Sequence, residues 1–490
     1  MEAPEPQKPF MKRFQEKLAA SRFFTFSLLL HVVIVILGGS VVLFKAYQEP
    51  PDFEAAEGGL VDPGATVAQP PNTPQDMTET FTPEAPSITA PTLTAMTTTN
   101  MTTPTFQVAA SVPIVKPPQT DQMSKMLEKT AQAMAKGAAG NVPGAMAGRM
   151  GGTRQKMMEA NKGKAKSEEA VMRGLRWLVK HQNSDGSWAP QERSAMTGFG
   201  LLSFLGHGET PTSAEFGPTV QKAVDWMVAE GQKYEGKLSM TKDGWGGNGG
   251  VYAHAIAAYA LGEYYSMTKD ERVAPLLRQS IDYIVKGQGP DGGWMYGYDK
   301  SQSDTSVSGW QIQALKAAHL TGLNIEGVDA ALDKAMLNLK RVQTNVGGFG
   351  YRKPEDRPGG EGYSLCGVGV LCTYFWKQDK GDEVVRDGIK FMLDDDRPKV
   401  NYKGDNADLY AWYYNTQACL MVGGSAWSKW NRMFQDEICD NQSPDGSWPP
   451  VNAKHGEALK SPEGYGPFYR TNLCILMLEV FYRYMPTTKG

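Results

Sequence analysis

The feature that most constrains the fold is a motif that returns about every 50 residues along the last two thirds of the chain. In this motif a glutamine precedes an aromatic residue by six positions, and glycine stands between them. The complete copies are Gln182 to Trp188, Gln288 to Trp294, Gln343 to Phe349 and Gln442 to Trp448. A stretched copy ends near Trp245, and a degenerate copy has Tyr402 at the corresponding place. Six units at this spacing predict a repeat architecture.

Each copy of the motif lies between two predicted helices. The helix before it is amphipathic, as in VMRGLRWLVKHQ, where Val171, Leu175 and Leu178 share one face. The helix after it is apolar nearly all round, as in VYAHAIAAYALGEYY. Because helices that are apolar on all sides are buried, we expect the second helices to form an inner ring and the first helices an outer ring. The sequence therefore predicts an all-α fold, an α6/α6 toroid of six helical hairpins over residues 166–486.

A helix followed by Gln-x-x-x-Gly-x-Trp resembles the QW repeat of the squalene and oxidosqualene cyclases, which also occurs in protein prenyltransferase β subunits. In squalene-type cyclases, an Asp-x-Asp-Asp-Thr-Ala motif opens an inner helix and supplies the acid that protonates the substrate. Laid on this chain, that motif falls on residues 301–305, where only Asp304 and Thr305 match and Ser303 stands at the place of the acid. A serine hydroxyl is far too weak an acid for this step. The usual cyclase chemistry is therefore not expected, and Asp299 is a further candidate for a replacement acid.

The resemblance to prenyltransferases implies a zinc site made by an aspartate, a cysteine two residues later and a distant histidine. The matching helix offers Cys366 without an aspartate at that offset. We expect no metal and no cofactor. The five cysteines lack Cys-x-x-Cys spacing and lie mostly among apolar residues, which is typical of buried, inert thiols.

Polar and aromatic residues near the starts of the predicted inner helices are the candidates for lining the toroid cavity and binding a ligand. They are His254, Asp304, Thr305, Tyr363, Asp408, Tyr410, Tyr469 and Arg470. Asp304 and Asp408 are also the candidates for a catalytic acid, but an aspartate before an apolar run is equally a helix N-cap. His254 and Tyr363 are alternatively packing residues with satisfied hydrogen bonds. Tyr410 is alternatively a core residue.

A separate feature lies near the start of the chain. Residues 23–44 form an apolar run without formal charge, which is long enough to span a membrane. A basic tail, residues 1–22, precedes the run, and acidic residues follow it. This asymmetry predicts a single-pass helix in the bacterial inner membrane, with a cytoplasmic N-terminus and a periplasmic toroid. Ser27 and His31 lie one turn apart on this helix and resemble the anchor of TonB, which implies contact with ExbB/ExbD-like membrane proteins.

The segments between this run and the repeats have a biased composition. Residues 45–120 are rich in Pro and Thr and have neither a helical nor a strand period, which predicts a disordered tether. Residues 121–165 are rich in Met, Ala and Gly and are interpreted as a linker, with a partner-binding helix as the alternative. The chain has 50 basic and 53 acidic residues, a balance that gives no indication of nucleic-acid binding.

Three functions remain open at this point. A binding or scaffold toroid would engage a polypeptide or a hydrophobic ligand in its cavity, and the missing cyclase acid and zinc ligands favour this interpretation over an enzyme. A terpenoid-processing enzyme would need a non-standard acid. A glycan-processing enzyme would need two facing carboxylates. The shape and lining of the inner surface distinguish these possibilities.

Overall fold

The computed structural model describes residues 144–239, 249–358, 360–397, 399–452 and 457–484. The chain divides into two compact units, residues 1–56 and 57–490, and every described residue belongs to the second unit. The predicted tail, membrane span and tether, together with Ser27, His31 and Trp245, lie outside the described residues. Among the helices that are described, none combines the length and the apolar character needed to cross a membrane.

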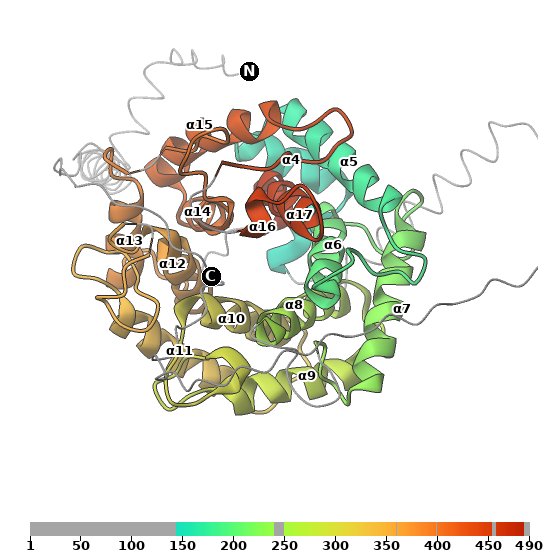
Figure 1. The fold of residues 1–490 in the computed structure, drawn as a ribbon, viewed down its shortest axis with the longest axis horizontal. Helices are drawn as coiled ribbons and strands as arrows, with labels where there is room; N and C mark the ends of the chain where they lie inside the picture. The colour runs from blue at the N-terminus through green and yellow to red at the C-terminus, as the bar shows by residue number, and fades with distance from the viewer. Residues whose placement is uncertain (1–143, 240–248, 359, 398, 453–456, 485–490) are drawn as a thin grey trace, which may run out of the picture. The chain divides into compact units, whose positions relative to one another are not determined.

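Two concentric rings of helices make up the fold (Figure 1). The inner helices are α6 (Arg193–His207), α8 (Gly250–Thr268), α10 (Thr305–Leu320), α12 (Tyr363–Lys377), α14 (Leu409–Val422) and α17 (Gly466–Leu478). The outer helices are α5 (Ala165–Lys180), α7 (Gly217–Lys233), α9 (Ala274–Gly287), α11 (Val328–Val342), α13 (Glu383–Met392) and α15 (Gly424–Asp440). Each inner helix packs on the next, and α17 packs on α6, so the inner ring is closed. The predicted arrangement of inner and outer helices is confirmed.

The folded ring begins earlier than the sequence predicts. Residues 144–165, which the composition assigns to a linker, form the 3-10 helix η1 (Gly144–Arg149), helix α4 (Gly151–Ala160) and the first residue of α5. The cause is a buried tertiary contact: Arg149 Nη1 lies 2.7 Å from a carboxylate oxygen of Glu263, and Arg149 Nε donates to the carbonyl of Arg483 at 2.7 Å. Helix propensity is a local property of the sequence, so it cannot reveal partners that are this distant along the chain.

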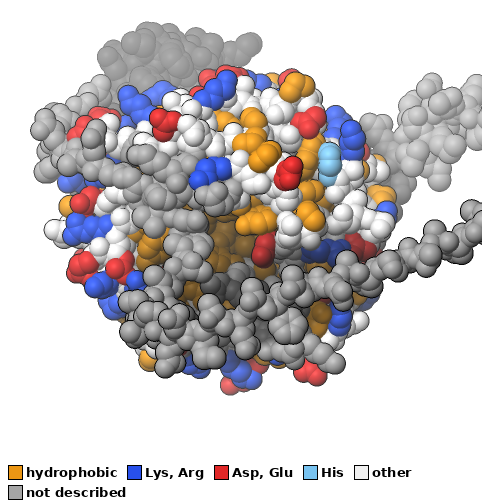
Figure 2. Space-filling view, in the orientation of Figure 1, with side chains coloured by type: hydrophobic (Ala, Val, Ile, Leu, Met, Phe, Trp, Pro, Cys, Tyr) orange, Lys and Arg blue, Asp and Glu red, His pale blue; other side chains and the backbone are white. Residues whose placement is uncertain are grey.

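Three further short helices complete the described elements: η2 (Tyr296–Tyr298), α16 (Glu457–Lys460) and α18 (Val480–Arg483). In the view down the ring, hydrophobic side chains gather toward the centre of the visible face, and charged side chains occupy its periphery (Figure 2). All five cysteines are buried free thiols, and burial raises the pKa of each. The prediction that the thiols are buried is confirmed.

The glutamine of each complete repeat joins one outer helix to the next. Its side-chain amide donates to the glycine carbonyl of its own loop and to a backbone carbonyl near the start of the following outer helix. These second acceptors are Thr219 for Gln182, Ala331 for Gln288, Val384 for Gln343 and Ala170 for Gln442, at 2.9, 2.8, 3.0 and 2.9 Å. The last contact connects the sixth repeat to the first and thereby closes the outer ring.

The glycine and the tryptophan of the motif complete the joint. Gly446 has a φ of +98°, and a Cβ atom there would lie 2.4 Å from the carbonyl oxygen of Arg173 in α5. The buried indole of Trp448 donates to the carbonyl of Ile438 at 2.8 Å, and Trp188 and Trp294 make the same contact in their own repeats. The loop therefore lies directly on the neighbouring hairpin.

This contact predicts a large cost for a single methyl group. Gly446→Ala should lower the free energy of unfolding by about 3 kcal/mol, because the backbone of α5 blocks the added Cβ. Gly424→Ala is the matched control: Gly424 also has a positive φ, of +60°, but nothing lies within 4 Å of the position that a Cβ atom would take there. That variant should lose only about 1 kcal/mol. Urea unfolding followed by circular dichroism measures both, and equal losses would contradict the proposed joint.

Candidate functional site

The starts of the inner helices meet at one end of the ring, which we call the mouth. Asp304 caps α10 there, and its carboxylate accepts the backbone N–H groups of Ser306 at 2.8 Å and Val307 at 3.2 Å. The Ser306 hydroxyl also donates to the same oxygen, at 2.5 Å. Burial raises the pKa of Asp304, and the cap hydrogen bonds oppose that rise. Asp304 is thus a structural cap with a carboxyl group that holds its proton more tightly than usual.

A short chain of hydroxyl groups extends from Asp304. Ser306 Oγ is hydrogen-bonded to the hydroxyl of Tyr252, which lies 3.4 Å from the hydroxyl of Tyr296. Both tyrosines are half-buried, and the centres of their rings are 5.6 Å apart. The chain therefore runs from a buried carboxyl group to side chains that reach solvent.

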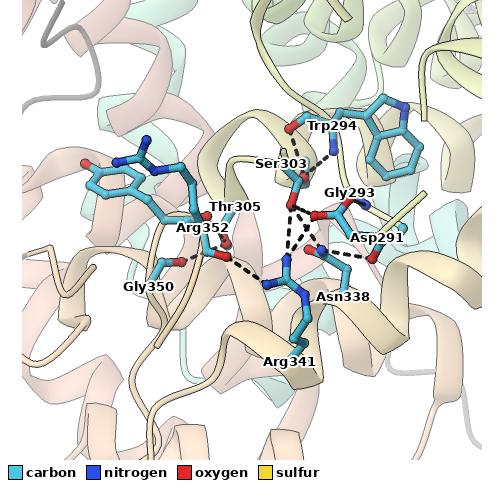
Figure 3. A network of polar contacts seen from close by, with 12 residues as sticks. Asp291, Gly293, Trp294, Ser303, Thr305, Asn338, Arg341, Gly350 and Arg352 are labelled. Carbon is cyan, nitrogen blue, oxygen red and sulfur yellow. Dashed lines mark hydrogen bonds and ion pairs between the residues drawn. The ribbon is translucent and has the colours of Figure 1, made fainter. Parts of the chain in front are cut away.

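Ser303, at the place of the cyclase acid, belongs to a polar network behind the mouth (Figure 3). Its hydroxyl donates to Asp291 Oδ2 at 2.6 Å and accepts from the side-chain amide of Asn338 at 3.1 Å. Arg341 forms an ion pair with the same carboxylate at 3.0 Å. Asn338 and Arg341 belong to α11, so the network fastens the loop of one repeat to the outer helix of the next. The role of Ser303 in this structure is therefore to hold the loop against α11.

Thr305 has a similar fastening role. Its hydroxyl donates to the carbonyl of Gly350 at 2.8 Å, and its backbone N–H donates to the carbonyl of Tyr351 at 2.7 Å. These bonds tie the start of α10 to the loop of the following repeat. Thr305 lies at the mouth, and its polar groups are already engaged.

Asp408 is the second buried cap. Its carboxylate accepts the N–H of Ala411 at 3.0 Å and the hydroxyl of Ser364 at 2.7 Å. The capping interpretation of Asp304 and Asp408 is confirmed. Asp299, the further candidate acid, is exposed, and hydrogen bonds from the N–H and hydroxyl of Ser301 lower its pKa. That direction is the opposite of what a general acid requires.

In the stretched repeat, His254 makes the contact with the next outer helix that a glutamine makes in the complete repeats. Its Nδ1 accepts the N–H of Leu238 at 3.0 Å, and its Nε2 donates to the carbonyl of Ser280 in α9 at 2.9 Å. Burial lowers the pKa of His254 to about 4, so the ring is neutral at pH 7. The packing interpretation of His254 therefore describes its contacts, which link the segment after α7 to the next outer helix as the glutamines do elsewhere.

Aromatic side chains contact one another across the lumen of the toroid, below the mouth. Phe199 of α6 lies 5.2 Å from Trp310 of α10, and Trp310 lies 5.7 Å from Tyr413 and 5.4 Å from Tyr414 of α14, measured between ring centres. Helices α6, α10 and α14 alternate around the inner ring, so these side chains meet across the lumen. Tyr410 stands one turn above Tyr414, with 5.1 Å between their centres.

Tyr410 and Tyr469 both belong to the mouth. Burial, and then the nearby Tyr469 and Asp304, raise the pKa of Tyr410. Tyr469 is half-buried, and its ring lies 5.6 Å from that of Phe199. Tyr351 stands in the same surroundings and is also half-buried. The mouth is therefore lined by tyrosines from several repeats.

The side chains of Arg470 and Tyr363 lie away from the mouth. Arg470 is buried and donates to the carbonyls of Trp448 at 3.2 Å, Leu459 at 3.1 Å and Ser461 at 2.6 Å, while burial lowers its pKa. It organises the loop before α17. Tyr363 lines a pocket in the outer wall of the ring.

The end of the ring opposite the mouth, which we call the floor, contains charged residues that are not among the candidates predicted from the sequence. Burial would raise the pKa of Glu263, but the guanidinium groups of Arg149 and Arg483 hold it lowered, to about 2. At the same end Glu479 is buried and Lys316 is half-buried, and loss of solvation shifts the pKa of each toward the neutral form. One signal was available: Glu263 is an acid inside an otherwise apolar helix.

Sequence comparison points to one class of relatives. No protein-family model matches the chain. The chain is 26% identical over 205 residues to a probable squalene–hopene cyclase of Sinorhizobium fredii and 25% identical over 178 residues to a squalene–hopene cyclase of Bradyrhizobium diazoefficiens. The matches cover 36% and 31% of this chain, but only 30% and 26% of the two relatives.

Two groups of solved structures are similar at low identity. A GH76A α-1,6-mannanase from Salegentibacter sp. HEL1_6 has 12% identity and a TM-score of 0.47, over 64% of this chain and 98% of its own. The type II terpene cyclase MstE from Scytonema has 12% identity and a TM-score of 0.44, over 64% and 98%. The cyclase-like sequence matches and the closed double ring together support a cyclase-like α/α toroid.

The burial of His254 predicts a pH effect. Its pKa is 6.5 ordinarily and about 4 in the fold, so between these values the unfolded chain binds a proton that the folded chain does not. This residue therefore lowers stability by up to about 3 kcal/mol as the pH falls from 6.5 to 4. His254→Gln keeps a donor and an acceptor without titrating, and should lose this contribution. Urea unfolding across that pH range measures it; parallel stability curves for the two proteins would contradict it.

Proposed function

We propose that the chain is a binding protein whose toroid engages a polypeptide at its mouth. The observation that carries this proposal is the meeting of Phe199, Trp310 and Tyr413 across the lumen. These rings occupy the lumen below the mouth. An enzyme that folds a long isoprenoid needs a chamber that surrounds its substrate. A polypeptide needs only the mouth and its rim.

The lining of the mouth supports the same proposal. Tyr252, Tyr296, Tyr351 and Tyr469 are half-buried, each with part of its surface available to a ligand. Tyrosine offers a large apolar face, one hydroxyl group and little conformational entropy to lose, which is why it is common in protein-binding surfaces. A purely hydrophobic ligand is the alternative occupant.

The cellular setting of the proposal comes from the sequence pattern. We propose that residues 23–44 anchor the chain in the bacterial inner membrane, with the toroid in the periplasm. The uncharged run and the basic residues before it support this orientation. Ser27 and His31 would then face a partner such as an ExbB/ExbD-like complex.

Photo-crosslinking from the mouth tests the proposed ligand class. A photoreactive phenylalanine analogue at Tyr469 in the full-length chain should yield adducts with polypeptide in cells, identified by mass spectrometry. The matched control carries the analogue at Leu337, which is 70% exposed on the outer helix α11. Lipid adducts alone at Tyr469 would favour the hydrophobic ligand, and indistinguishable adducts from the two positions would contradict a binding mouth.

A second candidate function is an isoprenoid-processing enzyme that uses Asp304 as its acid. The buried carboxyl group with its raised pKa and the hydroxyl chain to Tyr296 favour this candidate. The sequence similarity to squalene–hopene cyclases supports it as well. Its weakness is the set of aromatic contacts across the lumen, from Phe199 to Trp310 and from Trp310 to Tyr413.

Asp304→Asn separates the two candidates. Asparagine caps helices as well as aspartate does, so the fold and polypeptide binding should persist. An enzyme that depends on this acid should lose about 100-fold or more of its activity. Product formation from squalene and shorter isoprenoids, followed by mass spectrometry, measures the effect. A cyclised product that disappears in the variant would establish the enzyme and contradict the binding proposal.

A further inference from the structure

Three basic side chains gather around one tyrosine at the floor of the ring. The guanidinium carbons of Arg149 and Arg483 lie 5.0 and 5.4 Å from the ring centre of Tyr484. The Nζ atom of Lys316 lies 5.0 Å from the same ring centre. Lys316 belongs to the inner helix α10, whereas the two arginines belong to η1 and α18. Like charges in such a group repel one another unless a carboxylate lies among them.

The carboxylate that forms ion pairs in this group is engaged by the arginines. Glu263 lies 2.7 Å from Arg149 and 3.4 Å from Arg483. The hydroxyl of Tyr484 donates a hydrogen bond to the same carboxylate. Of the three basic residues, Lys316 alone forms neither an ion pair nor a hydrogen bond within the described part of the chain. Its amine therefore lacks the partner that an ammonium ion requires in a desolvated place.

The amine of Lys316 instead faces aromatic side chains. Its Nζ atom lies 2.9 Å from the ring centre of Phe375 in α12. An aromatic face attracts an ammonium ion, but this attraction offsets only part of the lost hydration. Lys316 is half-buried, and its Nζ is not one of the fully buried unpartnered atoms of the described residues, so the amine still touches solvent. A small molecule can therefore reach it.

The surroundings of the amine favour its neutral form. Loss of solvation lowers the pKa of Lys316 well below its usual range, the charge of Glu263 opposes this change, and the two arginines add to it. A lysine that is desolvated beside other cations is a nucleophile at neutral pH, because its nitrogen keeps a free lone pair. The charged and titratable groups around it are Arg149 of η1, Glu263 of α8, Cys372 of α12, Arg483 of α18 and Tyr484.

We propose that Lys316 is a nucleophilic amine that forms a Schiff base with a small aldehyde at the floor of the ring. The nitrogen lone pair attacks the carbonyl carbon to give a carbinolamine. Loss of one water molecule, made of the carbonyl oxygen and the two amine hydrogens, then leaves a C=N bond, so the step needs no oxidant or reductant. Phe375 and Tyr484 place apolar surface beside this bond, which favours an aldehyde with an apolar chain. The site is separate from the mouth and does not depend on the function proposed for it.

Reductive trapping over a range of pH tests the proposal. The full-length chain is treated with propanal and cyanoborohydride at pH values from 5 to 9, and peptide mass spectrometry measures the modification rate of each lysine. Lys222, which is exposed on the outer helix α7, is the matched control within the same sample. Its neutral fraction rises about 100-fold between pH 7 and pH 9, as for any lysine with an ordinary pKa.

The ratio of the two rates gives the result. Because the amine of Lys316 is already neutral at pH 7, the ratio of its rate to that of Lys222 should fall about 100-fold between pH 7 and pH 9. Any effect of pH on the reductant is common to both lysines and leaves the ratio unchanged. A ratio that stays constant with pH, or the absence of an adduct on Lys316 at every pH, would overturn the proposal.

A variant tests the contribution of the neighbouring charges. Arg483→Gln removes one cation beside the amine and should move the midpoint of the Lys316 pH profile upward by about one unit. Arg386→Gln is the matched control, since Arg386 is an exposed arginine of α13 that pairs with Asp387, and it should leave the midpoint in place. A midpoint that does not move in Arg483→Gln would contradict the assignment. If this variant does not fold, the pH profile of the unaltered chain decides the proposal by itself.

Discussion

The ring depends on one hydrogen-bonded joint, in which a glutamine amide connects two successive outer helices. The amide shapes its own loop through the glycine carbonyl and at the same time binds a carbonyl of the next hairpin. A single hairpin with one apolar helix could not bury that helix, whereas a closed ring gives every inner helix a neighbour on both sides. The contact from Gln442 to Ala170 repeats this joint between the last repeat and the first, where α17 also packs on α6.

The repeat spacing was sufficient to predict this architecture, because every repeat carries the residues of its own joint. The caps formed by Asp304 and Asp408 were also predictable, since capping is a local property of sequence. The extra helices η1 and α4 were not, because Arg149 finds its acceptors at Glu263 and Arg483, separated from it by 114 and 334 residues. The direction of Tyr363 toward the outer wall was equally inaccessible, because it follows from a degenerate repeat two helices later.

The two irregular repeats show how a repeat fold acquires individual sites. In one, the imidazole of His254 replaces the glutamine and keeps the seam closed. In the other, the joint is missing and the seam between α13 and α15 holds a pocket with Trp430 at its base. The same logic applies to Ser303, since the position that provides an acid in the cyclases is used here to fasten a loop to α11. Both His254 and Ser303 thus join one repeat to the next.

Arg149 also sets the direction in which the ring can be held. Helix η1 lies against the C-terminal ends of α6 and α8, through the Leu205 carbonyl and Glu263, whereas the tyrosines of the mouth lie toward the N-terminal ends of the inner helices. Gly144, the first described residue, therefore lies at the floor of the ring. The mouth lies at the other end of the ring. In the arrangement proposed above, the ring would be attached at the end opposite its binding surface.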